Sequence, residues 1–249
     1  MAGAPPPSGL RAALRREGDK QALVDWVFTR VAPRYDLGND IMSLGWHTRW
    51  KRRLVDLAEL RPHHRVLDLA CGTGDVTWMA APLVPDGEVV GVDVNPDMLA
   101  LAPAKAPGPA PHVRFVQCDA AALPFDDHTF DRVLVGYAGR GFPDLPAVLR
   151  EAFRVLKPGG ELWNLDFARP PNRAWDRVYR GWMTVSGAVL GAVLHGHPET
   201  YVYIPESMRH YPGQRWLDAR MQEVGFQTRL IETRACLMAF NQGIKPVQA

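Results

Sequence analysis

The sequence has little of several features that would quickly assign it to a class of protein. Its 249 residues contain three scattered cysteines, Cys71, Cys118 and Cys236, with no C-x-x-C pair, so neither a disulfide framework nor a zinc site is indicated. The net charge is only +2, which by itself gives no reason to expect nucleic acid as a partner. The longest apolar run, Trp182–Leu194, is shorter than the roughly 20 residues that cross a bilayer. A globular protein of the reducing cytoplasm is the simplest interpretation.

Two common nucleotide-binding motifs are also incomplete. A dinucleotide fingerprint needs a third glycine three residues after the second, and Thr77 occupies that position. A phosphate-binding P-loop needs Gly-Lys-Ser/Thr, and no lysine lies between Lys51 and Lys105. We therefore do not expect the chain to hold a pyrophosphate through either motif.

What is present is a glycine turn between two apolar segments, the second of which ends in Asp93. Glycines let the backbone approach a ligand closely, and an acidic residue about 20 positions beyond the turn is placed to bind ribose hydroxyls. Asp68 before the turn and Asp75 after it would repel a pyrophosphate but suit a cation. S-adenosylmethionine carries an ammonium and a sulfonium, so these residues favour it as the cofactor.

Strands and helices alternate from Arg65 onward, which predicts an α/β fold with a doubly wound, mostly parallel seven-stranded sheet covered on both faces. We expect strands at Arg65–Ala70, Glu88–Asp93, Val113–Gln117, Phe130–Val135, Glu161–Phe167, Gln227–Glu232 and Cys236–Asn241. We expect helices at Val76–Leu83, Pro96–Ala102, Leu145–Leu156 and Gln214–Val224. Lys157-Pro158-Gly159-Gly160 is expected to end the third of these helices and lead into the fifth strand.

Two further segments add helices to this core. Residues 18–60 have apolar residues at helical spacing and predict an N-terminal helical lid, while residues 171–212 form a helical insertion before the last two strands. We expect a single domain over 18–249, after a disordered tail of residues 1–17. The apolar run in the insertion is either a core or lid helix, or a helix that lines a substrate channel or touches a membrane surface.

The cofactor site is expected where the first four strands end, because open α/β sheets bind ligands at that edge. Asp93 would bind the ribose, Asp119 would accept from the adenine amino group, and Ala120 would offer its backbone N–H to a ring nitrogen. The candidate cofactor-binding residues are Asp68, Cys71, Gly72, Thr73, Gly74, Asp93, Val94, Asp119 and Ala120.

Several segments resemble known methyltransferases. Leu123–Asp131 and Val155–Gly160 resemble the class I S-adenosylmethionine-dependent methyltransferase pattern. Val31–Gly45, followed by His47, Trp50 and Lys51, is similar to a signature of the ubiquinone/menaquinone biosynthesis C-methyltransferases, which include demethylmenaquinone methyltransferases. Tyr203–Arg209 is similar to a second signature of that family. The resemblance runs from about Val24 to Lys245.

This resemblance implies methyl transfer from S-adenosylmethionine to a ring carbon of a reduced prenylated quinone, usually demethylmenaquinol to menaquinol in bacteria. It implies that Arg140 stabilises the developing phenolate or orients a water, and that Tyr35 bonds a ring oxygen. The chain departs from the family at Gly141, where an asparagine is usual. The chain therefore lacks a side-chain amide that could hold a ring oxygen or a water at this position.

Two alternatives stay open from the sequence. The glycine-rich loop around Arg140 would also suit a methyltransferase of another aromatic or polyketide acceptor. The chain could instead be a cofactor-binding subunit of a membrane-associated biosynthetic assembly. We expect no metal, because His195-x-His197 lacks a third ligand, and no nucleic-acid partner, because a basic stripe is missing. The apolar acceptor suggests peripheral contact with the inner face of the membrane, and a homodimer is left open.

Overall fold

The computed structural model describes residues 17–43, 45–233 and 237–247, and the expected tail up to residue 16 lies outside them. The described residues form one sheet from β1 (Arg65–Leu69), β2 (Glu88–Asp93), β3 (Val113–Gln117), β4 (Phe130–Gly136), β5 (Leu156–Phe167), β6 (Gln227–Glu232) and β7 (Met238–Ile244). The strand order is β3-β2-β1-β4-β5-β7-β6, and β7 runs antiparallel to both of its neighbours. The predicted doubly wound, mostly parallel sheet is confirmed.

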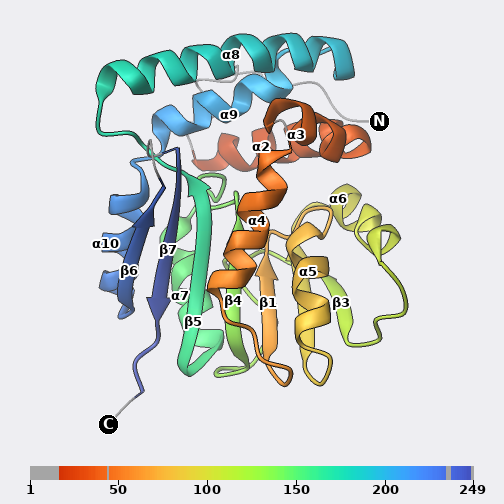
Figure 1. The fold of residues 1–249 in the computed structure, drawn as a ribbon, viewed down its shortest axis with the longest axis vertical. Coiled ribbons are helices and arrows are strands. Elements are labelled where there is room, and N and C mark those ends of the chain that lie inside the picture. Colours follow the sequence, from red (N-terminus) through yellow and green to blue (C-terminus); the bar gives the residue numbers. More distant parts are fainter. Residues whose placement is uncertain (1–16, 44, 234–236, 248–249) are drawn as a thin grey trace.

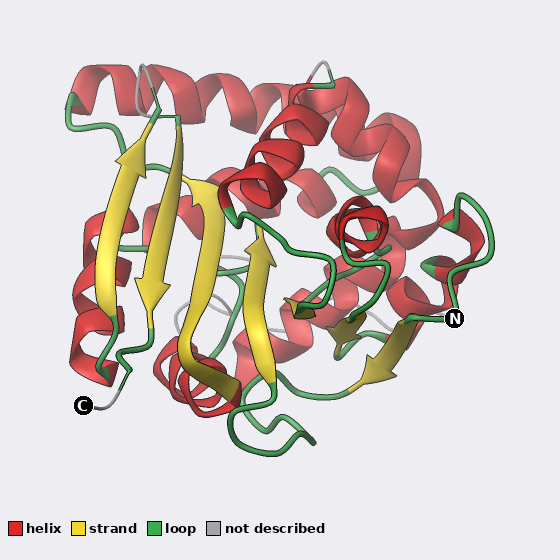
Figure 2. Ribbon diagram, turned by 60° about the horizontal axis from the view of Figure 1, so that its bottom comes forward, coloured by secondary structure: helices red, strands yellow, loops and turns green. Residues whose placement is uncertain are grey.

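The helices divide between the two faces of the sheet and one of its ends (Figures 1 and 2). They are α2 (Glu17–Val31), α3 (Tyr35–Ser43), α4 (Trp46–Leu57), α5 (Asp75–Ala80), α6 (Pro96–Leu101), α7 (Leu145–Val155), α8 (Arg173–His195), α9 (Glu199–His210) and α10 (Gln214–Val224), with 3-10 turns η1 (Ala32–Arg34), η2 (Ala81–Leu83) and η3 (Pro103–Lys105). Helices α4 and α5 pack on one face, and α7 and α10 pack on the other.

Side-chain alternation along β1 explains why the sheet has two buried faces. Val66 joins the cluster with Leu54 of α4, whereas Leu67 and Leu69 join the cluster with Val148 of α7. All of these side chains are buried, as expected for a central strand of a parallel sheet with helices on both sides. The ends of β1, β2 and β4 are thereby held rigidly at one edge, where the site lies.

The fifth strand begins earlier than the sequence predicts. Leu156 pairs with Phe130, so the Lys-Pro-Gly-Gly segment belongs to β5 instead of preceding it. Gly159 donates to the Lys245 carbonyl at 2.8 Å, and Lys245 donates to the Gly160 carbonyl at 2.9 Å. This pairing with the chain that follows β7 is a long-range interaction, and the local glycine and proline signal could not predict it.

The last strand is displaced from its predicted position. It runs from Met238 to Ile244 and pairs with β5 along its whole length, from Phe167 opposite Met238 to Glu161 opposite Ile244. The predicted start at Cys236 lies outside the described residues. The error arises because Asn241 is a poor strand former taken alone, whereas here its side chain is buried and donates to a backbone carbonyl.

Helices α2, α3, α8 and α9 form a lid over the end of the sheet where β1, β4 and β5 terminate (Figure 1). A separate apolar cluster holds the lid together, with Leu23 and Val27 of α2 packed against Tyr201 and Tyr203 of α9. Gly38 on α3 leaves room for α9, because a Cβ there would overlap the Tyr201 hydroxyl.

Small residues also set the distance between α8 and α9. A Cβ on Gly187 would lie 3.1 Å from the Tyr201 carbonyl, and one on Gly191 would lie 2.6 Å from the His197 carbonyl. Helix α8 is therefore seated closely on α9 and forms the outermost layer of the lid. None of the described helices is both long enough and apolar enough to span a bilayer.

Candidate functional site

A small cavity of about 100 Å³ lies at the glycine turn between β1 and α5. Most of its lining comes from the turn with the end of β2, the loop that follows β4, and α2, and single residues of α3, α6 and α9 complete it. Its lining includes Ala70, Gly72, Asp93, Val94, Gly136, Tyr137, Arg140, Phe142, Val24, Asp25 and Phe28. Of the nine predicted cofactor residues, Gly72, Asp93 and Val94 are in this lining.

The turn positions the Asp93 carboxylate at the cavity. Gly72 and Gly74 have φ of 55° and 82°, a left-handed conformation that favours glycine. Gly72 N–H donates to Asp93 at 2.8 Å, and Asn95 N–H donates to the other oxygen at 2.9 Å. Burial, and to a smaller extent the carboxylate of Asp25, raises the pKa of Asp93. A carboxylate in the lining favours a ligand that carries positive charge.

Other predicted residues of the glycine turn lie outside the lining of the small cavity and pack beneath the turn. Asp68 is fully buried and accepts from the Thr77 hydroxyl at 2.6 Å, and burial raises its pKa to about 7. Gly74 packs close to Phe115, and burial raises the pKa of the Cys71 thiol. Their predicted contact with a cofactor stays a prediction.

The predicted adenine contacts lie outside the lining of this cavity. Asp119 is exposed, and its carboxylate accepts from the Ala121 N–H at 2.9 Å, as in a turn-forming aspartate. Ala120 is buried in the cluster on the α7 face. Their adenine-binding role also stays a prediction.

Asp75, which the sequence suggested as a partner for a cationic ligand, instead pairs with two lysines of the chain. Its two oxygens accept from Lys51 and Lys105, each at 2.6 Å, so two ammonium groups already neutralise it. Burial would raise its pKa, but Lys51 and Lys105 outweigh burial and lower it to about 2. Lys105 also contacts Asp36 and Thr73, each at 2.6 Å. The cluster ties the glycine turn to the lid.

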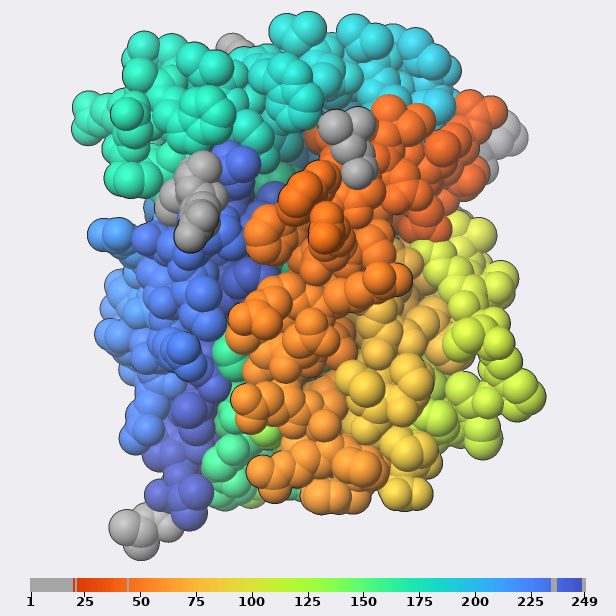
Figure 3. Space-filling model, viewed as in Figure 1, coloured from red at the N-terminus to blue at the C-terminus, as the bar shows by residue number. Residues whose placement is uncertain are grey.

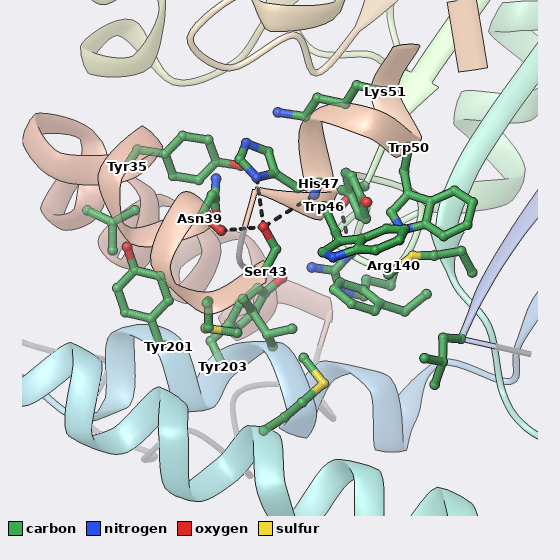
Figure 4. Close-up of a pocket in the computed structure, with 18 of the residues that line it drawn as sticks. Tyr35, Asn39, Ser43, Trp46, His47, Trp50, Lys51, Arg140, Tyr201 and Tyr203 are labelled. Carbon is green, nitrogen blue, oxygen red and sulfur yellow. Dashed lines mark hydrogen bonds between the residues drawn. The ribbon is translucent and has the colours of Figure 1, made fainter. Parts of the chain in front are cut away.

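A second and larger cavity of about 440 Å³ lies between the lid and the end of the sheet (Figure 4). Its lining is mostly apolar and rich in aromatic side chains: Phe28, Tyr35, Trp46, Trp50, Tyr137, Phe167, Tyr179, Trp182, Tyr201 and Tyr203. Every lid helix contributes to it, and so does α4. Its size and composition suit an apolar ligand with a ring.

Arg140 lies where the two cavities meet, because it lines both of them, as do Tyr35 and Tyr203. Its Nη1 donates to Asp166 at 2.6 Å and to the Tyr137 carbonyl at 2.7 Å, and its Nε donates to Ser207 at 3.2 Å. Burial opposes its charge, but Asp166 outweighs burial and raises the pKa of Arg140. Over the described ranges, nothing accepts from Nη2. The guanidinium is thus permanently charged, fixed in place and still able to donate.

His47 is a cavity residue whose chemistry the sequence did not single out. The Ser43 hydroxyl donates to the Asn39 carbonyl at 2.7 Å, so His47 Nδ1, 2.8 Å from that hydroxyl, must carry a proton and donate (Figure 4). The basic lone pair therefore resides on Nε2, which lies 3.3 Å from the Thr48 hydroxyl. Burial and the Lys51 ammonium lower the pKa of His47, so the imidazole is neutral near physiological pH.

Tyr203 occupies the space beside Gly141. A Cβ at Gly141 would lie 3.6 Å from the Tyr203 hydroxyl. That hydroxyl is buried and finds no partner among the residues the structure describes. Burial raises the pKa of Tyr203 to about 12, so it stays a neutral donor. A polar group is therefore present beside the position where the sequence resemblance leads us to expect an asparagine.

Sequence comparisons agree with this geometry. The model of the ubiE/COQ5 methyltransferase family matches residues 16–245. A demethylmenaquinone methyltransferase of Thermus thermophilus is 42% identical over 220 residues, which cover 88% of this chain and 100% of that protein. A ubiquinone/menaquinone biosynthesis C-methyltransferase of Pasteurella multocida is 40% identical, over 92% of this chain and 87% of that protein. These matches confirm the resemblance to the family.

Solved structures agree on the fold. A SAM-dependent methyltransferase from Thermotoga maritima has a TM-score of 0.61 and 18% identity, covering 89% of this chain and 99% of that one. One from Aquifex aeolicus has a TM-score of 0.58 and 16% identity, covering 78% and 89%. At these identities, the likeness shows the architecture alone.

Proposed function

The chain belongs to the ubiE/COQ5 methyltransferase family, and we propose that it transfers the methyl group of S-adenosylmethionine to a ring carbon of a reduced prenylated quinone, with demethylmenaquinol as the acceptor. The observation that carries this proposal is the meeting of the two cavities at Arg140 and Tyr35. One cavity has the carboxylates and the glycine turn, and the other has the apolar volume.

The small cavity fits S-adenosylmethionine in its chemistry. Asp93 supplies negative charge that a sulfonium or ammonium would neutralise, and it keeps unused lone pairs for ribose hydroxyls after accepting from two N–H groups. When bound, the cofactor supplies a methyl group already activated by its sulfonium. Asp68, Cys71, Thr73 and Gly74 would hold the turn in shape, and Asp119 and Ala120 would bind the adenine.

At the acceptor, the chain has to orient the ring and accept the one proton that the reaction releases. Arg140 Nη2 would donate to a ring oxygen and stabilise the phenolate that makes the neighbouring carbon nucleophilic. Tyr35 and Tyr203 would hydrogen-bond the ring oxygens, Tyr203 in place of the asparagine that Gly141 replaces. His47 Nε2 would accept the proton of that ring hydroxyl, directly or through a water. After methyl transfer, the hydrogen displaced from the methylated carbon would return to the ring oxygen and restore the aromatic ring. The lid would shield the ring from water and leave the large cavity for the start of the prenyl chain.

The test is methyl transfer to short-chain demethylmenaquinone, followed by mass spectrometry with and without a reductant. We expect a gain of one methyl group only under reducing conditions. Transfer to soluble phenols but to no prenylated quinol would favour another aromatic acceptor. Cofactor binding without transfer, relieved by added partner proteins, would favour a subunit of an assembly. Peripheral contact with the bilayer that holds the acceptor is part of this proposal.

A further inference from the structure

The outward face of α8 is apolar where a surface helix is normally polar. From Val178 to Val193 its exposed residues are Val178, Gly181, Trp182, Val185, Val189, Ala192 and Val193. The four valines are 60–72% exposed, and Trp182 is 55% exposed. Their spacing of three and four residues places them on one stripe. A stripe of large apolar side chains on the surface marks a site of contact with a partner or a membrane.

The opposite side of α8 already has its partner. Gly187 and Gly191 pack against α9, and Met183 is buried beneath the helix. The helix is thus apolar on both sides, which is typical of a helix with a second apolar environment. Figures 1 and 2 place α8 along one end of the molecule, and Figure 3 shows it as the outermost ridge there. A flat surface could approach this ridge along its whole length.

The ends of α8 have the side chains that favour a lipid surface. Trp175, Tyr179 and Trp182 stack along its first half, with ring centroids 6.4 and 6.5 Å apart. Such aromatic rings are enriched at membrane–water interfaces. Arg173 and Arg177 are exposed at the same end, and at the other end Arg34 bonds the Leu194 carbonyl at 2.6 Å.

Acidic charge is nearly missing from the helix itself. Asp176 is the one carboxylate in α8, and it is buried and paired with Arg180. Because Arg180 already pairs with that carboxylate, α8 has no further acidic side chain to pair with Arg173 or Arg177. This charge pattern complements anionic lipid headgroups.

The stripe is continuous with the large cavity. Trp182 belongs to the stripe and also lines the cavity, together with Tyr179 and with Trp46, which is 51% exposed. Helix α3 packs beside α8 and adds exposed Leu37 and Ile41 at the same end of the molecule. A path of apolar side chains thus leads from the surface into the cavity.

We propose that the outward face of α8 docks on an anionic bilayer, with Val178, Trp182, Val185, Val189 and Val193 in contact with the acyl region. In this orientation the cavity opens toward lipid, and a prenylated acceptor enters it without crossing water. The docking deepens the bilayer contact of the proposed function by naming the face that makes it, and it can be measured without any acceptor. The delivery of the acceptor rests on the proposed methyl transfer.

The test is co-sedimentation of the protein with vesicles of phosphatidylcholine containing phosphatidylglycerol, compared with pure phosphatidylcholine. The variant is Val185→Asp with Val189→Asp, neither of which lines a cavity. The matched control is Leu83→Asp with Leu101→Asp, which makes the same change of charge at exposed apolar residues outside the lid. We expect the wild type and the control to bind anionic vesicles, more weakly at high salt, and the α8 variant to bind at least about tenfold more weakly.

Equal sedimentation of the α8 variant and the control would overturn the proposal. A wild-type dimer by light scattering that becomes monomeric in the α8 variant, with vesicle binding missing from both, would assign the stripe to a second copy and also overturn it. Turnover separates this inference from the proposed function. A water-soluble, truncated acceptor should be methylated equally by the wild type and the variant, whereas methylation of a vesicle-embedded acceptor should fall. Failure of both proteins on the truncated acceptor would count against the proposed function alone.

Discussion

The Lys51–Asp75 pair gives a prediction whose magnitude follows from the structure. The pKa of Asp75 is lowered from 3.8 to about 2, and this difference contributes about 2 kcal/mol of stability at neutral pH. Lys51 is 8% exposed, and removing its partner strands a buried charge, which typically costs about 3–5 kcal/mol. Asp75→Asn should therefore lower the free energy of unfolding, measured in urea, by about 2–5 kcal/mol.

A double-mutant cycle separates the pair from its surroundings. Lys51→Met fills the same space without a charge, so Lys51→Met with Asp75→Asn should cost less than the sum of the single changes by at least about 1 kcal/mol. The sign with pH is also fixed. Because the folded pKa is lowered, the contribution of Asp75 is present above about pH 4 and is lost as the pH falls toward 2. A loss below about 0.5 kcal/mol, or strictly additive single changes, would refute the reasoning.

The remaining predictions concern the two cavities and the buried carboxylate below them. Asp93→Ala should weaken cofactor binding by about 1.5–3 kcal/mol in calorimetry, and unchanged affinity would remove Asp93 from the ribose site. Arg140→Ala should lower kcat by about 10²-fold or more at nearly unchanged cofactor affinity, and an effect on affinity alone would exclude its role with the acceptor. His47→Gln should lower kcat by about 10²-fold. Because the pKa of His47 is lowered, wild-type kcat should fall only at pH values below the ordinary histidine range. If the variant's kcat falls with the same acid pH dependence, the base is another residue. Asp68 has a raised pKa of about 7, so without cofactor its ionisation lowers the stability of the wild type as the pH rises from about 4 to 7. The free energy of unfolding of Asp68→Asn should therefore rise relative to that of the wild type from acid to alkaline buffer. A difference between the two proteins that stays the same at every pH in urea unfolding would contradict this.

The architecture was predictable because it follows from local pattern. Apolar runs such as Val66–Leu69 and Val89–Val92 are long enough to indicate buried strands, and the glycine turn between them identifies the edge that binds a ligand. The family signatures pointed to Tyr35 and Arg140, which the structure brings to the boundary between the two cavities. Their chemical roles stay predictions.

What the sequence could not give depends on pairings between distant segments. Asp75 looked available for a cation, because the two lysines that neutralise it lie 24 and 30 residues away. Asp25 carries no motif of its own and reaches the small cavity only through the way α2 packs. His47 stood in a signature, yet its tautomer depends on a hydroxyl one helical turn earlier and its pKa on burial.

The close fit of Gly38 against Tyr201 has a consequence for how this sequence can vary. The two positions lie on different helices, and the Tyr201 hydroxyl fills the volume that any side chain at 38 would need. A larger residue at position 38 fits this packing only if a smaller residue replaces Tyr201. A smaller residue at position 201 leaves a void unless a larger residue replaces Gly38. Substitutions at these two sites should therefore occur together in evolution, and each alone should be selected against on packing grounds.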